Sequence, residues 1–122
     1  MNRLRIAIIG TGGISNSHVR AYKQMEDIEI VAGADIVPGK AREALDRWEL
    51  PNAEAFEDTQ AMLDKVKPDA VSVCTYNTAH AVCAIAAMRA GAHVLLEKPM
   101  TVTLEDAQEL RRVEKETGRI LT

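Results

Sequence analysis

The 122-residue sequence is poor in aromatic residues and cysteine, and it carries no surplus of positive charge. One tryptophan, two tyrosines and one phenylalanine are its only aromatic residues, so the core must be built mainly from aliphatic side chains. Fifteen basic against eighteen acidic residues give a net charge of −3, which provides no positive field for nucleic acid. Its two cysteines, Cys74 and Cys83, fall in predicted core segments, where we expect small reduced residues and no disulfide.

Long apolar runs are also missing. The run at 6–9 is too short for the core of a signal peptide, and the run at 81–88 is too short to span a bilayer. We therefore expect a cytoplasmic protein with no membrane partner. The three histidines and two cysteines lack the spacing of metal ligands, and no serine lies in a Gly-x-Ser-x-Gly context, so neither a metal site nor a hydrolase is expected.

What the sequence does contain is a regular alternation of strand-like and helical patterns. Strands are predicted at 4–9, 28–34, 70–75, 93–97 and 119–122, with a short strand around Ala55-Phe56; helices are predicted at 13–25, 38–48, 58–66, 78–90 and 103–117. This rhythm predicts one α/β domain with a Rossmann doubly wound parallel sheet, strand order 3-2-1-4-5-6, in which 119–122 begins the sixth strand. The last helix is predicted to face the core through Leu104, Ala107, Leu110 and Val113.

A glycine turn follows the first predicted strand directly. In Gly10-Thr11-Gly12-Gly13-Ile14-Ser15, Gly10 suits a tight reversal, and Gly12 suits a close approach of backbone to a diphosphate at the start of a helix. Asp35 ends the second strand twenty residues past Ser15, which is the spacing at which an acid meets the ribose hydroxyls of a dinucleotide. The turn and the acid together predict a dinucleotide site.

Four segments are expected to converge at the carboxyl edge of the sheet, where the strand order reverses between strands 1 and 4. They are the glycine turn, Asp35, the segment 75–77 after the fourth strand and the segment 97–99 after the fifth. Each could be explained alone as a turn, a strand end or a helix stop. Their common edge favours a binding function.

At these residues the chain resembles the glucose-fructose oxidoreductase, inositol dehydrogenase and rhizopine catabolism (Gfo/Idh/MocA) family, over all 122 residues. The most specific part is the run Asp69-Ala70-Val71-Ser72-Val73-Cys74-Thr75 with Asn77 and His80, continuing as Ala90-Gly91-Ala92-His93-Val94-Leu95-Leu96-Glu97-Lys98-Pro99. The resemblance implies an NAD(P)-dependent oxidoreductase that transfers hydride between nicotinamide and a secondary alcohol, such as a sugar, polyol or cyclitol.

The resemblance also implies roles for individual residues. The pyrophosphate would be held by Gly10, Gly12, Gly13 and Ile14, and the nicotinamide half would lie near Thr75, Tyr76, Asn77, His80 and Glu97. Asp35 would bind the adenosine ribose and repel a 2′-phosphate, which favours NAD over NADP, although Lys40 or Arg42 could alter that preference. Lys98 would contact the cofactor and would also be the catalytic residue, hydrogen-bonded to the reacting oxygen of the substrate.

Three positions qualify the resemblance. Ser15 stands where the glycine fingerprint has Gly or Ala, and Tyr76 stands where the family commonly has proline. His18, at the family's glycine-loop histidine position, could be a packed structural residue or a functional one.

The resemblance further implies a C-terminal substrate domain, which this chain lacks, so we expect the chain to be the cofactor-binding part of a longer, homo-oligomeric enzyme and to be inactive alone. Two alternatives stay open: a non-catalytic module that senses NAD(H), and a domain that binds S-adenosylmethionine at the same sheet edge. The identity of the substrate and the direction of the reaction are not determined by these residues.

Overall fold

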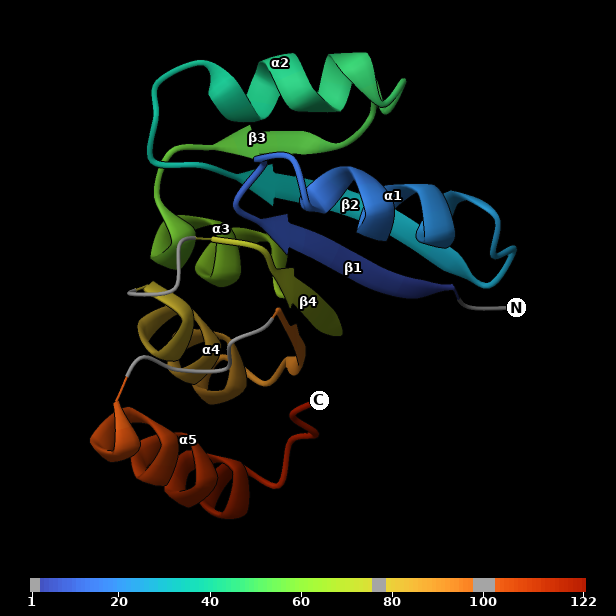
Figure 1. Ribbon diagram of the computed structural model, residues 1–122. Coiled ribbons are helices and arrows are strands. Elements are labelled where there is room, and N and C mark those ends of the chain that lie inside the picture. The colour runs from blue at the N-terminus through green and yellow to red at the C-terminus, as the bar shows by residue number, and fades with distance from the viewer. Residues whose placement is uncertain (1–2, 76–78, 98–102) are drawn as a thin grey trace.

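The computed structural model describes residues 3–75, 79–97 and 103–122. In this part of the chain, parallel strands form one sheet in the order β3-β2-β1-β4-β5 (Figure 1). The strands are β1 (Leu4–Ile9), β2 (Ile28–Ala34), β3 (Glu54–Phe56), β4 (Ala70–Val73) and β5 (His93–Leu96), and the helices are α1 (Ser15–Lys23), α2 (Lys40–Arg47), α3 (Thr59–Val66), α4 (His80–Arg89) and α5 (Leu104–Thr117). The predicted Rossmann-type α/β fold is therefore confirmed.

The central strand β1 sends alternate side chains into two separate cores. Ile6 and Ile8 join a cluster with Val19 of α1 and with Leu45 of α2. Ala7 and Ile9 join the larger cluster on the other face, which includes residues of α3, α4 and α5. Successive side chains of a strand point to opposite faces, so this arrangement is the doubly wound sheet that the sequence predicts.

The sixth strand is present only as a start. Leu121 forms an isolated parallel bridge with Val94 of β5. Backbone hydrogen bonds from Val94 to Ile120 (2.8 Å), from Thr122 to Val94 (2.9 Å) and from Leu96 to Thr122 (2.7 Å) hold this segment against the edge of the sheet. The predicted position beside the fifth strand is confirmed.

The helix ends carry the residues that helix boundaries require. The side chains of Asp58 and Thr103 accept hydrogen bonds from the amides of Ala61 and Asp106, which caps α3 and α5. The prediction for the apolar face of α5 is wrong at one residue: Leu110 and Val113 are buried, but Leu104 is 73% exposed. Leu104 begins the helix, where no described element covers it, and sequence periodicity cannot tell where a helix overhangs its support.

No helix in the described ranges is long and apolar enough to cross a membrane.

Candidate functional site

The glycine turn leaves β1 directly beside the backbone that follows β4. Gly10 has a φ of +89°, a conformation that side-chain-bearing residues rarely adopt. A Cβ added there would lie 2.8 Å from the backbone of Cys74 and of Thr75, while the Gly10 amide donates to the Ala34 carbonyl at 2.8 Å. Gly10 is therefore required both by its backbone angle and by the strand behind it.

The next three residues present backbone donors. Within the described residues, the amides of Gly12, Gly13 and Ile14 donate to no protein group. The carbonyls of the same three residues accept from Ser15, Asn16 and Ser17, which starts α1. A Cβ on Gly12 or Gly13 would meet nothing within 4 Å. Three unengaged N–H groups at a helix N-terminus, beside open space, fit a diphosphate.

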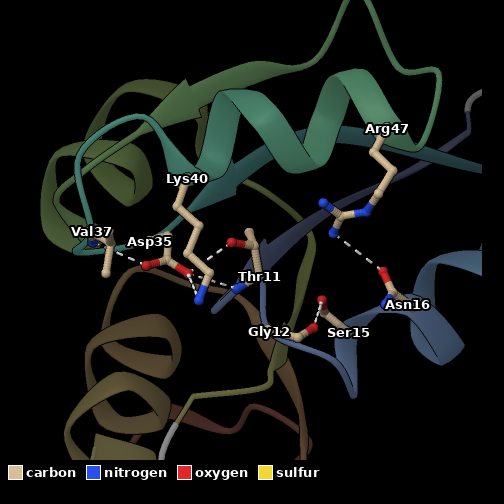
Figure 2. Close-up of polar contacts among 8 residues, drawn as sticks. All are labelled: Thr11, Gly12, Ser15, Asn16, Asp35, Val37, Lys40 and Arg47. Atoms are coloured by element: carbon tan, nitrogen blue, oxygen red, sulfur yellow. Dashed lines mark hydrogen bonds and ion pairs between the residues drawn. The ribbon is translucent and has the colours of Figure 1, made fainter.

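Ser15, the departure from the glycine fingerprint, does not disturb this turn. Its side chain is fully buried, and its hydroxyl donates to the Gly12 carbonyl (Figure 2). The hydroxyl thus ties the first turn of α1 to the loop, and the buried residue is small enough to keep helix and sheet in contact.

Asp35 lies at the carboxyl end of β2 and points back at the turn (Figure 2). One carboxylate oxygen accepts from the Thr11 amide at 3.0 Å and from the Thr11 hydroxyl at 2.7 Å, and the other accepts from the Val37 amide at 3.0 Å. The ammonium of Lys40 lies 3.9 Å away. Burial opposes the ionised form, but the hydrogen bonds from Val37 and Thr11, helped by Lys40, outweigh it and hold the pKa of Asp35 below its ordinary value.

The turn and Asp35 border one cavity of about 520 Å³ at the carboxyl edge of the sheet. Such a volume lies within the usual range for small-molecule sites. Six residues predicted for the cofactor line it: Gly10, Gly12, Gly13, Ile14, Asp35 and Thr75. The cavity lies over β1 and β4, where the strand order reverses, which is the position the topology predicts for a ligand.

Two other predicted residues lie near this edge but do not line the cavity. His80 is buried, and its Nε2 donates to the Thr75 carbonyl at 2.9 Å, so it supports the segment after β4. Glu97 follows β5, and its Oε1 lies 2.6 Å from Nε2 of His18. Tyr76, Asn77 and Lys98 lie outside the described residues.

The sequence analysis did not anticipate several lining residues. Thr59 of α3 and Cys83 of α4 close the cavity on the side away from α1. Nothing in the sequence marks Thr11 as the partner of Asp35. Both cysteines are free and buried. Burial, reinforced by the charge of Glu97, raises the pKa of Cys74 to about 12, and burial also raises that of Cys83, so neither is a reactive thiolate.

A second hollow, of about 300 Å³, lies away from this edge and is lined by residues including Arg3, Lys23 and Asn52. The cations there are engaged with backbone: Arg3 donates to the carbonyls of Glu26 and Ile28, and Lys23 donates to that of Trp48 at 2.6 Å. The larger cavity, with unengaged donors, is therefore the better candidate site.

Comparison with known proteins agrees with this geometry. The model of the GFO_IDH_MocA oxidoreductase family, NAD-binding Rossmann fold, matches residues 4–122. The chain is 39% identical over 119 residues to a D-glucoside 3-dehydrogenase of Escherichia coli, covering 97% of this chain and 33% of the relative. It is 33% identical over 117 residues to an inositol 2-dehydrogenase of Salmonella paratyphi B, covering 95% of this chain and 34% of the relative.

A solved structure is similar over almost the whole chain. It is the WlbA dehydrogenase of Chromobacterium violaceum in complex with NADH and UDP-GlcNAcA, which superposes with a TM-score of 0.91 at 29% identity and covers 99% of this chain and 34% of the other. The chain spans about a third of the length of the curated relatives it matches.

Proposed function

The chain belongs to the Gfo/Idh/MocA oxidoreductase family, whose NAD-binding Rossmann domain it forms, and we propose that it holds NAD(H) for hydride transfer to or from a secondary alcohol. The relatives named for glucosides and inositols support a sugar, polyol or cyclitol as the substrate. Because the relatives are about three times as long, the substrate side of the reaction is assigned to residues beyond this chain.

One observation carries the proposal: three unengaged backbone donors and an ionised carboxylate border the same cavity at the strand-order reversal. The amides of Gly12, Gly13 and Ile14 would bind the diphosphate at the positive end of α1. Asp35 would accept from the hydroxyls of the adenosine ribose. When bound, the nicotinamide group supplies or accepts the hydride, and the protein orients it.

The charges around the ribose position support NAD over NADP. The carboxylate of Asp35 would lie against a 2′-phosphate and repel it. Arg42 is engaged elsewhere, since it pairs with Asp46 at 2.9 Å and donates to the Ala53 carbonyl at 3.1 Å. Among the described residues, Lys40 is the cation that lies beside Asp35, so its ammonium is the group that could attract the 2′-phosphate of NADP.

We also assign the catalytic role to Lys98, on the match of Glu97-Lys98-Pro99 to the family motif. An ammonium at the end of β5 could hydrogen-bond the reacting oxygen and stabilise its alkoxide character as hydride leaves. In a longer protein that contains this sequence, Lys98→Met should abolish turnover while most of the NADH binding persists. Near-normal turnover of that variant would remove Lys98 from the mechanism.

Calorimetric titration of the 122-residue chain with NADH, NADPH and S-adenosylmethionine tests the cofactor. We expect NADH to bind most tightly, NADPH more weakly and S-adenosylmethionine not at all. Equal or tighter NADPH binding would overturn the assignment of Asp35, and binding of the methyl donor alone would replace the oxidoreductase proposal. Binding of NADH by a longer protein that turns over no alcohol would indicate a sensor.

A pair of glycine variants makes the binding test specific. Gly12→Ala adds a methyl group where no protein atom lies within 4 Å, so the fold should persist while NADH affinity falls at least about tenfold, because the methyl group meets the diphosphate. Gly10→Ala places its methyl group against the end of β4 at a positive φ and should cost about 2–4 kcal/mol of stability. Unchanged NADH affinity in Gly12→Ala would place the ligand elsewhere.

A further inference from the structure

His18 of α1 and Glu97 at the end of β5 form a contact between residues 79 positions apart. Nε2 of the imidazole lies 2.6 Å from Oε1 of the carboxylate, and the two side chains are only 9% and 28% exposed. Solvent screens such a partly buried pair less than a surface ion pair, and its hydrogen bond is charge-assisted. The contact joins the helix that begins at the glycine turn to the strand end at the cavity's edge.

The chemistry of the pair fixes which atom carries the proton. A carboxylate only accepts, so Nε2 of His18 is the donor. The other ring nitrogen, Nδ1, is buried and has no hydrogen-bond partner among the described residues. A buried polar atom without a partner costs free energy, so the pair is not optimised for the stability of the fold. This cost points to a role for the contact in the site.

The surroundings hold the imidazole in one orientation. Its ring meets that of Tyr22 edge-on, with centroids 6.4 Å apart and an interplanar angle of 75°. The hydroxyl of Tyr22 is in turn hydrogen-bonded to that of Ser72 in β4. On the other side, the charge of Glu97 is felt by Cys74, whose pKa it raises in addition to burial, and Cys74 lines the cavity. Glu97 is thus held beside the cavity by a fixed donor.

We propose that His18 is a positioning residue, which holds the Glu97 carboxylate where the nicotinamide half of the dinucleotide lies. The inference rests on the proposed function, since it takes the cavity to be the NAD(H) site. Because α1 presents the diphosphate donors at its start and His18 one turn later, one rigid helix sets the distance between the diphosphate and Glu97. His18 acts through Glu97 and does not touch the ligand itself.

The test compares two ligands on the 122-residue chain. NADH reaches both halves of the site, whereas ADP reaches only the glycine turn and Asp35. His18→Asn shortens the side chain and removes the donor at Nε2, and it should weaken NADH about tenfold while ADP affinity stays unchanged. His18→Gln is the matched control, because its amide nitrogen reaches the Nε2 position, and it should restore most of the NADH affinity.

A double-mutant cycle isolates the pair. Glu97→Ala should weaken NADH at least as much as His18→Asn does, and the double variant should lose little more than Glu97→Ala alone, because His18 acts only through the Glu97 carboxylate. Equal losses for NADH and ADP, additive losses in the double variant, or no rescue by His18→Gln would overturn the positioning role. If the unsubstituted chain bound neither NADH nor ADP, the proposed function itself would fail.

Discussion

Thr11 and Asp35 show how much of this site depends on single hydrogen bonds. The Thr11 hydroxyl and amide both donate to one oxygen of the Asp35 carboxylate, which is largely buried. A hydrogen bond to a charged group contributes more to stability than one between neutral groups, because the charge strengthens the attraction. Removing such a bond also leaves a buried ion poorly solvated. Thr11 therefore keeps Asp35 ionised and in place before any ligand arrives.

Thr11→Val should lower the free energy of unfolding by about 1.5–3 kcal/mol at pH 7. Asp35 has a lowered pKa in the folded state, so its stabilisation is full above the pKa of the unfolded chain and is lost as the pH falls through the folded value. The difference between variant and parent should therefore shrink in acid. Urea unfolding at neutral and acidic pH measures it.

Thr117→Val is the matched control for that experiment. Its hydroxyl donates to the uncharged Val113 carbonyl at 2.8 Å, so the same substitution should cost less, and equally at both pH values. A Thr11→Val effect that is independent of pH would contradict the link to Asp35.

For helices and strands, the sequence predicts that an element exists more reliably than it predicts where the element begins and ends. Every predicted helix is present, but α1 begins at Ser15 rather than 13, since residues 12–14 form the turn, and β4 ends at Val73, two residues early. Apolar periodicity marks the packed part of an element, whereas its end depends on turn geometry and on neighbours distant in sequence. The predicted burial of Leu104 was wrong for the same reason, since this residue lies at the end of a helix.

The end of α3 offers a prediction. Lys67 follows the helix with a φ of +49°, which is unfavourable for a residue with a side chain and natural for glycine at this position. Lys67→Gly should therefore raise the free energy of unfolding by about 0.5–1 kcal/mol. Lys65→Gly, the same change inside the helix, should lower it by about 1 kcal/mol. Chemical denaturation compares the two, and a destabilised Lys67→Gly variant would contradict the strain assigned here.

At the scale of the whole molecule, ligand binding should raise the free energy of unfolding. The cavity is bordered by the ends of β1 and β2, by the segment after β4, and by residues of α2, α3 and α4, so a bound dinucleotide stabilises only the folded chain. NADH at a hundred times its dissociation constant should raise the free energy of unfolding by about 2.7 kcal/mol. Differential scanning calorimetry with and without ligand tests this, and Gly12→Ala, with its weaker NADH binding, should be stabilised less by about 1.3 kcal/mol or more at the same NADH concentration. An equal shift in that variant would contradict diphosphate binding at the turn.

The convergence of the site was predictable because it follows from topology. The carboxyl ends of parallel strands share an edge, so Gly10, Asp35 and Thr75 had to meet once the strand order was known. The pairing of His18 with Glu97 was not predictable, because it depends on the direction of two side chains, one from a helix and one from the edge of the sheet. Motif spacing contains no information on such a contact, and only packing decides it.

The backbone of Cys74 and Thr75, which lies against Gly10, has a consequence for folding during synthesis. Synthesis delivers residues 4–35, which contain the turn and its acid, before Cys74 and Thr75. Gly10, however, takes its shape against Cys74 and Thr75. A nascent polypeptide that has emerged only as far as β2 thus contains the turn and Asp35, which are proposed to bind the dinucleotide, without the backbone that shapes Gly10. About forty more residues must emerge from the ribosome before the pocket can form.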